Sequence, residues 1–245
     1  DFNKTQAGLY TQFSSANRGK IVHADFSTGG AKIANLTSFT FKDFGDTKSG
    51  DNRPSSYGDW GLLHHSVKQV GGVDSMISNA DPSVQLNSGY RQYDFLSKTI
   101  YSPVKWLNLS LNLQLSTSSN IDRFDQLNDY SGDHLKYAEW YYGPQNRSMA
   151  SLRGIFKNYN TLYTNGTATL AFQRISEDRI TRKYRVDEKL FQEEDLYVYS
   201  ANFDFTKVLP DKQRLYYGME FTHNDVHSNA RYENIRTGEI QSAIT

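Results

Sequence analysis

The stretch KWLNLSLNLQLSTSS, residues 105–119, alternates strictly between apolar and polar side chains. Leucine occupies every odd position from 107 to 115, and the even positions between them hold only asparagine, serine or glutamine. Successive side chains of a β-strand point to opposite faces, so a period of two predicts a strand. One face of this strand would be all leucine and the other all polar, and the strand must therefore separate an apolar environment from a wet one.

The same period recurs along the chain, and helical spacing is scarce. Including residues 106–118, about nine strands are expected. The others lie at roughly 3–14, 20–28, 32–44, 85–101, 146–158, 166–180, 195–207 and 214–224. In residues 32–44 the alternation slips between Leu36 and Phe39, which indicates a bulge or a misplaced strand edge. Several strands reach about 12 residues, whereas soluble strands average about five to six and tilted membrane strands need about 9–11.

The connections between these strands are of two kinds, and the two kinds alternate. Short turn-like links are expected at 27–30, 102–105, 159–165 and 209–213, and long polar segments at 45–84, 119–145 and 181–194. Short turns at one end and long loops at the other are typical of outer-membrane β-barrels. Aromatic residues also mark strand ends, such as Tyr197 and Phe205, as in the girdles at lipid headgroups. The sequence thus predicts an all-β, antiparallel transmembrane β-barrel whose leucines contact lipid.

Composition narrows the function classes. The 245 residues carry 27 basic and 27 acidic side chains, so no polycationic surface indicates nucleic acid. Cysteine is absent, which excludes a disulfide framework, a thiolate metal site and a cysteine nucleophile from this chain. No apolar run approaches the ~18 residues of a spanning helix. The chain begins in an alternating segment without a signal peptide, and we expect a mature protein or a fragment.

Four segments carry a family resemblance. They are FSTGGAKIANLTSFTFKDFGD (26–46), LNLQLSTSSNIDRFDQL (111–127), AEWYYGPQNR (138–147) and RLYYGMEFTHNDVHS (214–228). Together they resemble the barrel domain of TonB-dependent outer-membrane receptors of Gram-negative bacteria, in the branch associated with haem, iron complexes or cobalamin. The resemblance runs through most of the chain.

The resemblance implies a barrel of about 22 strands with a plugged lumen. It also implies uptake of a scarce ligand, driven by a TonB-type energy-coupling protein that acts through a plug region. About nine strands cannot close such a barrel, and no plug is recognisable. Residues 1–245 are therefore expected to form part of a single barrel domain in the bacterial outer membrane. Expected partners are membrane lipid, lipopolysaccharide and the coupling protein, with a surface lipoprotein or other outer-membrane subunits as further candidates.

The longest loop supplies the first candidate ligand-binding residues. His64 and His65 lie close in sequence to Tyr57 and Trp60, and a neutral imidazole is a good ligand for haem iron or a metal chelate. No further ligand stands at a metal-site spacing, so a solvated loop is the alternative. Neither a resident metal nor a cofactor is expected.

Two further candidates follow Trp140 in the segment AEWYYGPQ. Tyr141 and Tyr142 could form an aromatic platform for the ligand, or they could belong to the outer aromatic girdle. Catalysis finds no support, because the chain has neither a G-x-S-x-G elbow nor a phosphate-binding glycine loop.

Three polar groups remain open to two interpretations each. His223 and His227 could ligate a metal or lie at the membrane interface, and an oxygen-rich loop could hold calcium or be solvated. A basic rim could bind lipopolysaccharide phosphates or form internal ion pairs. The loop carboxylates are Asp122, Asp125, Asp129 and Asp133, and the rim residues are Arg174, Arg179, Arg182, Lys183 and Arg185.

Two alternatives to a transporter stay open. The chain could be a structural scaffold subunit of a multi-protein outer-membrane complex that reuses the receptor barrel. It could also be a soluble glycan-binding β-sandwich, in which a second sheet covers the leucine face.

Overall fold

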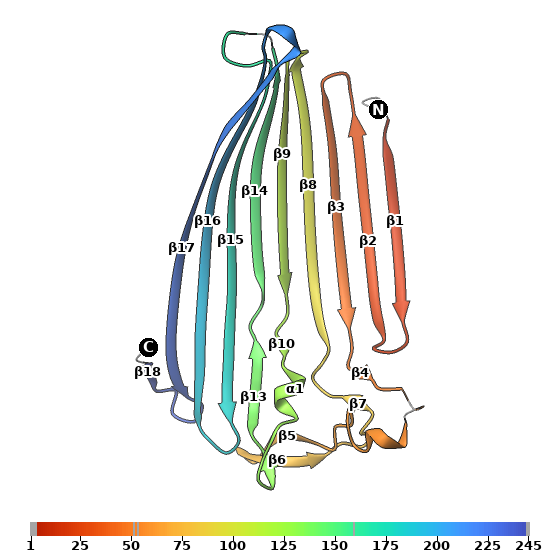
Figure 1. The fold of residues 1–245 in the computed structure, drawn as a ribbon. Coiled ribbons are helices and arrows are strands. Elements are labelled where there is room, and N and C mark those ends of the chain that lie inside the picture. The colour runs from red at the N-terminus through yellow and green to blue at the C-terminus, as the bar shows by residue number, and fades with distance from the viewer. Residues whose placement is uncertain (1–3, 51, 53, 159, 244–245) are drawn as a thin grey trace.

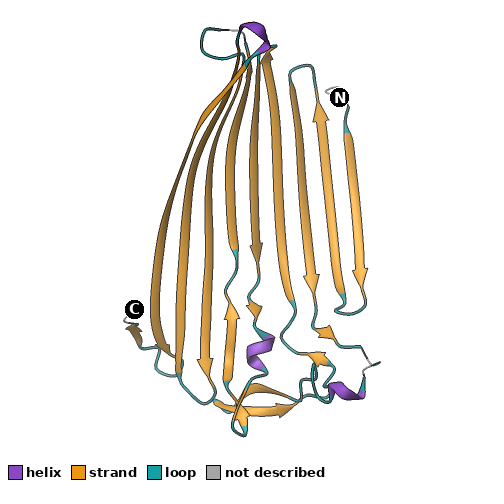
Figure 2. Cartoon of the chain, in the orientation of Figure 1, coloured by secondary structure: helices purple, strands orange, loops and turns teal. Residues whose placement is uncertain are grey.

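The computed structural model describes residues 4–50, 52, 54–158 and 160–243, and they form an all-β structure dominated by one antiparallel sheet of 12 strands (Figure 2). Nine long strands pair in chain order. They are β1 (Gln6–Ser14), β2 (Gly19–Gly29), β3 (Ile33–Phe44), β8 (Tyr90–Val104), β9 (Leu107–Ser118), β14 (Asn146–Lys157), β15 (Asn165–Lys183), β16 (Glu188–Val208) and β17 (Arg214–Asn234). The nine predicted strands are confirmed, although residue 3 of the first lies outside the described residues.

Short elements complete the structure. The large sheet also contains β10 (Ile121–Asp122), β13 (Tyr137–Tyr142) and β18 (Ile240–Ser242). Three two-stranded ribbons are β4 (Thr47–Lys48) with β7 (Val84–Gln85), β5 (His65–Val70) with β6 (Val73–Ser78), and β11 (Tyr130–Ser131) with β12 (His134–Leu135). The helical elements are the 3₁₀ turns η1 (Ser55–Tyr57) and η2 (Pro210–Lys212) and the one-turn helix α1 (Phe124–Leu127). Within the described residues, no helix is long and apolar enough to cross a membrane.

Two sequence expectations are wrong. Residues 181–194 are not a long loop, because β15 and β16 pair continuously from Asn165–Thr206 to Arg182–Lys189 and turn tightly at residues 184–187. The charged side chains there hide the strand period. The expected bulge in β3 is also missing, since its registers with β2 and β8 show no shift. The sequence alternation slips there because Leu36 lies on the polar face and Thr37 on the apolar face.

The connections sort by end, as expected. The links β2–β3, β8–β9, β14–β15 and β16–β17 all lie at one end of the sheet, drawn at the top of Figure 1. The long connections β3–β8 and β9–β14 both lie at the other end, which is called the loop end below. The short turns β1–β2, β15–β16 and β17–β18 share the loop end.

The two faces of the sheet differ in chemistry, and the pairing registers define them. Cross-strand partners share a face in a sheet. The row Leu111, Leu152, Leu170, Ala201 and Phe221 runs across β9, β14, β15, β16 and β17. The residues next to these on each strand point to the opposite face, and they form the row Asn112, Ser151, Ala171, Ser200 and Thr222. We call these the apolar face and the polar face.

No described part of the chain covers the apolar face. The buried apolar side chains among the described residues are Leu63, Leu135, Trp140 and Ile180, all at or beyond the loop end. None of the five leucines of β9 is buried, and three of them are 38–52% exposed. The sheet order starts at β1 and ends with β17 and β18, so the sheet stays open. An uncovered apolar sheet face of this size must contact something apolar in the intact protein.

Aromatic rings form two rows on the apolar face. Near the short-link end, Tyr163 and Phe205 have ring centroids 5.4 Å apart, and Phe205 and Tyr217 lie 5.5 Å apart. Nearer the loop end, Phe172 and Tyr199 lie 5.2 Å apart. From Tyr199, the partner of Phe172, to Phe205 the strand spans six residues, or about 20 Å at about 3.3 Å per residue. That length along a tilted strand fits within the apolar band of membrane barrels, which is about 25 Å tall.

Candidate functional site

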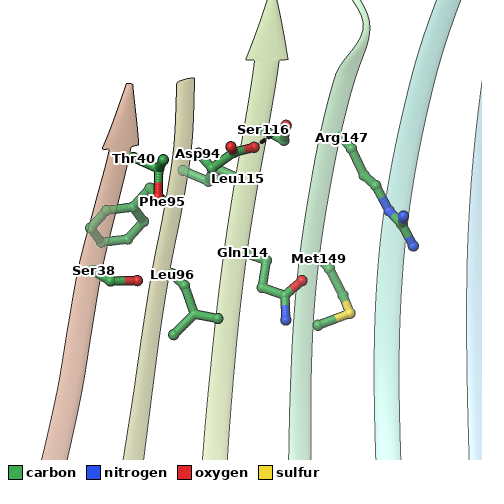
Figure 3. Close-up of a pocket in the computed structure, with 10 residues that line it drawn as sticks. All are labelled: Ser38, Thr40, Asp94, Phe95, Leu96, Gln114, Leu115, Ser116, Arg147 and Met149. Atoms are coloured by element: carbon green, nitrogen blue, oxygen red, sulfur yellow. Dashed lines mark hydrogen bonds between the residues drawn. The ribbon is translucent and has the colours of Figure 1, made fainter. Parts of the chain in front are cut away.

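The polar face is hollowed in the half nearer the loop end, where β3, β8, β9 and β14 lie side by side (Figure 3). The pocket has a volume of about 150 Å³. The side chains that reach it from the polar face are Ser38, Thr40, Asp94, Leu96, Gln114, Ser116, Arg147 and Met149. Because strand residues two apart share a face, the alternation seen in the sequence builds this polar surface.

Hydrogen bonds hold much of this pocket in place. The Asp94 carboxylate lies 2.9 Å from the ammonium of Lys42 and accepts a hydrogen bond of 2.7 Å from Ser116. The guanidinium of Arg147 donates to the Gln173 side chain at 2.9 Å. The wall therefore offers one carboxylate, one guanidinium and several amide and hydroxyl groups, which suits the binding of polar groups. Nearby, the side-chain oxygen of Asn112 is buried without a hydrogen-bond partner in the described part of the chain.

The long loops fold on one another at the loop end. A small apolar cluster joins loop 45–84 to loop 119–145, with Leu63, Leu86, Phe124, Leu127 and Tyr137 among its members. His65 Nδ1 lies 2.8 Å from the hydroxyl of Tyr130, which links the same two loops. The loops thus form an ordered cap, built from residues far apart in sequence.

A buried ion cluster fixes the cap to the sheet. Asp74 of β6 and Arg182 of β15 are each only 3% exposed, and they form a two-point ion pair. The Nη1 and Nη2 atoms of Arg182 donate to the Asp74 carboxylate at 2.7 and 2.9 Å, and the backbone N–H of Arg185 donates to it at 2.8 Å. Burial alone would raise the pKa of Asp74, but these hydrogen bonds and the Arg182 charge lower it below its ordinary value.

The cluster continues to β13 and β16. Arg182 Nε donates to Glu139 at 2.7 Å, and Lys189 Nζ lies 2.5 Å from the other Glu139 oxygen. Desolvation opposes ionisation of Glu139, but Lys189 and Arg182 lower its pKa below the ordinary value. Removing one partner of such a pair leaves a buried charge uncompensated, which costs about 3–5 kcal/mol.

Asp122 shows the opposite tendency. Burial, and then the nearby charges of Asp46 and Glu139, raise the pKa of Asp122 to about 6. Its neighbour in the chain behaves differently, because Arg123 holds the pKa of Asp125 at about 2 through hydrogen bonds of 2.8 Å. The carboxylates of this loop are therefore not equivalent. Within the described residues, no group of three or more histidine or acidic side chains could hold a metal ion.

The predicted ligand-binding residues of loop 45–84 lie in separate places. Tyr57 and Trp60 pack edge to face with centroids 5.6 Å apart, and Trp60 is 76% exposed. His64 lies 3.7 Å from the carboxylate of Asp59, whereas His65 contacts Tyr130. The two histidines have different partners.

Tyr141 and Tyr142 also point to different sides of β13. The Tyr141 ring lies 5.3 Å from the Lys189 ammonium, next to the ion cluster. The Tyr142 hydroxyl accepts a hydrogen bond of 3.1 Å from Arg123, whose guanidinium also lies over the buried Trp140. The six predicted residues do not line one pocket, and their role in binding stays a prediction.

Several of the remaining polar groups have partners within the chain. His223 and His227 lie on the apolar face beside Tyr199 and Tyr197, at the aromatic row. Of the basic rim, Arg174 pairs with Asp195 and Arg182 with Asp74, so for these two the internal ion-pair interpretation is confirmed. Asp74 itself was missed. It lies 108 positions from Arg182, and no local pattern connects them.

Comparison with known proteins adds no assignment. The chain matches no protein-family model, and no curated protein matches it significantly.

Proposed function

We propose that this chain is part of the barrel of a TonB-dependent outer-membrane receptor, and that the intact protein takes up a scarce ligand of the iron-complex, haem or cobalamin type. The observation that carries the proposal is the uncovered apolar face, bounded by two aromatic rows about 20 Å apart along the strand. Lipid is the environment that satisfies such a face without a second layer of protein. Every internal strand pairs on both sides, as a membrane sheet requires.

The polar face supports passage or plug contact on the other side of the wall. Its pocket of about 150 Å³ presents charged, amide and hydroxyl groups, which are costly to place against hydrocarbon but suit water or polar protein. The long loops gather at one end, which would be the cell exterior in such a receptor. Tyr57 and Trp60 would make early contacts with a ligand there.

The test is uptake by cells that carry or lack the gene. Radiolabelled haem, a ferric siderophore and cobalamin would be supplied separately under limiting conditions. The proposal predicts that uptake of one of them falls to background when the gene is deleted, and also when the energy-coupling protein is deleted. Unchanged uptake of all three in the gene deletion would contradict transport of these ligands.

A scaffold role is the second candidate, and one observation favours it. The six predicted ligand-binding residues do not converge, and ion pairs hold the loops closed on one another. A scaffold subunit would co-purify with fixed stoichiometry in a larger outer-membrane complex, and deletion of its gene would dissociate that complex while uptake stays normal.

A further inference from the structure

The hairpin β5–β6 is fastened to the sheet by a charge. Of its residues, only Asp74 is buried, and the valines at its tip, Val70 and Val73, are about half exposed. A lone two-stranded hairpin is marginally stable in water. The tip is therefore held chiefly by what the Asp74 carboxylate contacts.

Those contacts have the chemistry of an anion-binding site. The guanidinium of Arg182 meets the carboxylate with two parallel N–H groups, the arrangement with which arginine recognises carboxylates and phosphates. The backbone N–H of Arg185 adds a third donor, at a residue with a left-handed φ of 57° in the β15–β16 turn. Backbone N–H groups presented by such turns are recurrent anion sites.

The site is held in place without Asp74. Arg182 also donates to the Val186 carbonyl at 3.0 Å and to Glu139 at 2.7 Å, which anchors the guanidinium to the turn and to β13. Lys189 is the second cation of the cluster. With Asp74 withdrawn, two cations, Arg182 and Lys189, would face the single carboxylate of Glu139, so a net positive charge would remain.

We propose that the β15–β16 turn is a binding site for a phosphate or carboxylate group, which Asp74 occupies from within the chain. An external anion takes the place of Asp74 on Arg182 and on the Arg185 N–H, and the hairpin tip is released. Because the internal carboxylate blocks the site in most molecules, the apparent affinity for an external anion is lowered by the fraction of vacant sites.

The site lies beyond the aromatic row on the apolar side of β15, because Arg182 and Leu170 are an even number of residues apart on one unbroken strand. If the proposed function holds, on which this one point rests, the site lies at the depth of the lipopolysaccharide phosphates. The same chemistry would also bind a phosphate or carboxylate carried by a soluble ligand.

The test uses the full-length protein, purified from outer membranes, with inorganic phosphate as the probe. Calorimetry measures phosphate binding in wild type and in the variants Asp74→Asn and Arg182→Gln. The site predicts binding roughly tenfold or more tighter in Asp74→Asn than in wild type, because the internal competitor is weakened, and no binding in Arg182→Gln. Equal affinity in wild type and Asp74→Asn would overturn the proposal.

Hydrogen exchange supplies the second readout and guards against misfolding. Phosphate should speed exchange of residues 65–78 in wild type, while strand residues 107–118 stay protected as an internal reference. Asp81→Asn is the matched control, because Asp81 pairs with Lys48 at 3.0 Å in the same loop but about half exposed. No phosphate effect on residues 65–78 in wild type would also overturn the proposal.

Bilayers separate the two sources of the anion. Exchange of residues 65–78 is compared in nanodiscs with and without lipopolysaccharide. Faster exchange only with lipopolysaccharide supports a lipid phosphate, whereas release by free phosphate in both bilayers supports a soluble anion. Phosphate binding to Asp74→Asn in detergent does not depend on membrane insertion, so it stands even where the proposed function fails.

Discussion

Replacing Leu111 by arginine should destabilise the protein strongly. Leu111 is the middle one of the five leucines of β9, about 13 Å along the strand from Leu107 and from Leu115 at about 3.3 Å per residue. Its cross-strand neighbours on the apolar face are Thr99 and Leu152. If this face contacts lipid, Leu111 lies near the bilayer midplane, where an arginine costs about 2–4 kcal/mol.

The matched control is Asn112→Arg, one residue further along the same strand. Asn112 faces the polar side opposite Lys98, so the new charge stays wet and meets one like charge, which costs about 0.2–1 kcal/mol. The free energies of unfolding of the full-length variants would be measured by denaturant titration in lipid vesicles. The difference between the two variants should be at least about 1 kcal/mol, with Leu111→Arg the less stable.

A third variant, Leu111→Ala, separates lipid from a protein core. In a sandwich core this change would leave a cavity and cost about 2–5 kcal/mol. Against lipid, which refills the space, the loss should stay near the transfer free energy of the three removed carbon atoms, about 2.4 kcal/mol at about 0.8 kcal/mol each, which is the low end of the core range. Equal effects of Leu111→Arg and Asn112→Arg would refute the two-face reasoning. A loss of about 4–5 kcal/mol in Leu111→Ala, well above the transfer free energy, would refute lipid contact.

Two further predictions concern the cap and the aromatic row. Because burial raises the folded-state pKa of Asp122 above its unfolded value, the contribution of Asp122 to the stability of the cap is present at acid pH and is lost as pH rises through about 6. The pKa values of Asp74 and Glu139 are lowered, so their opposite contributions change only at more acid pH. Loop 119–145 should therefore resist proteolysis better at about pH 5 than at about pH 7.5; Asp122→Asn should remove that difference and the exposed control Asp133→Asn should keep it. A Cβ on Gly166 would lie 2.5 Å from the Phe205 ring, so Gly166→Val should cost about 1–3 kcal/mol in denaturant unfolding, whereas Gly30→Ala, with its nearest atom at 4.0 Å, should cost less than about 1 kcal/mol.

The strands were predictable wherever one face is apolar and the other polar. In β9 the leucines define the period of two, and in the structure all five lie on the apolar face, as expected. Beyond the aromatic row the rule fails, because both faces of β15 and β16 meet polar surroundings there. Residues 181–194 then read as a charged loop, although they form the ends of two paired strands.

The candidate site was less predictable, for a physical reason. The sequence marks residue types that suit a ligand, such as His64 and His65, but it does not show which side chain each one contacts. The Asp74–Arg182 pair is fixed only when loop 45–84 crosses the loop end to the β15–β16 turn. In the sequence, Asp74 follows Gly71, Gly72 and Val73, and such an aspartate is usually a solvated residue of a hairpin turn.

The most direct test of the central claim is the environment of each side chain along residues 107–118. Single cysteines would be introduced at successive positions of the full-length protein in lipid bilayers and spin-labelled, since this segment of the protein has no cysteine of its own. Collisions with oxygen report lipid, and collisions with a water-soluble nickel chelate report water. The account predicts strict alternation, with oxygen favoured at Leu109, Leu111 and Leu113 and nickel favoured at Ser110 and Asn112. Nickel access at both sets, or protection of the leucines from both reagents, would contradict a lipid-facing sheet.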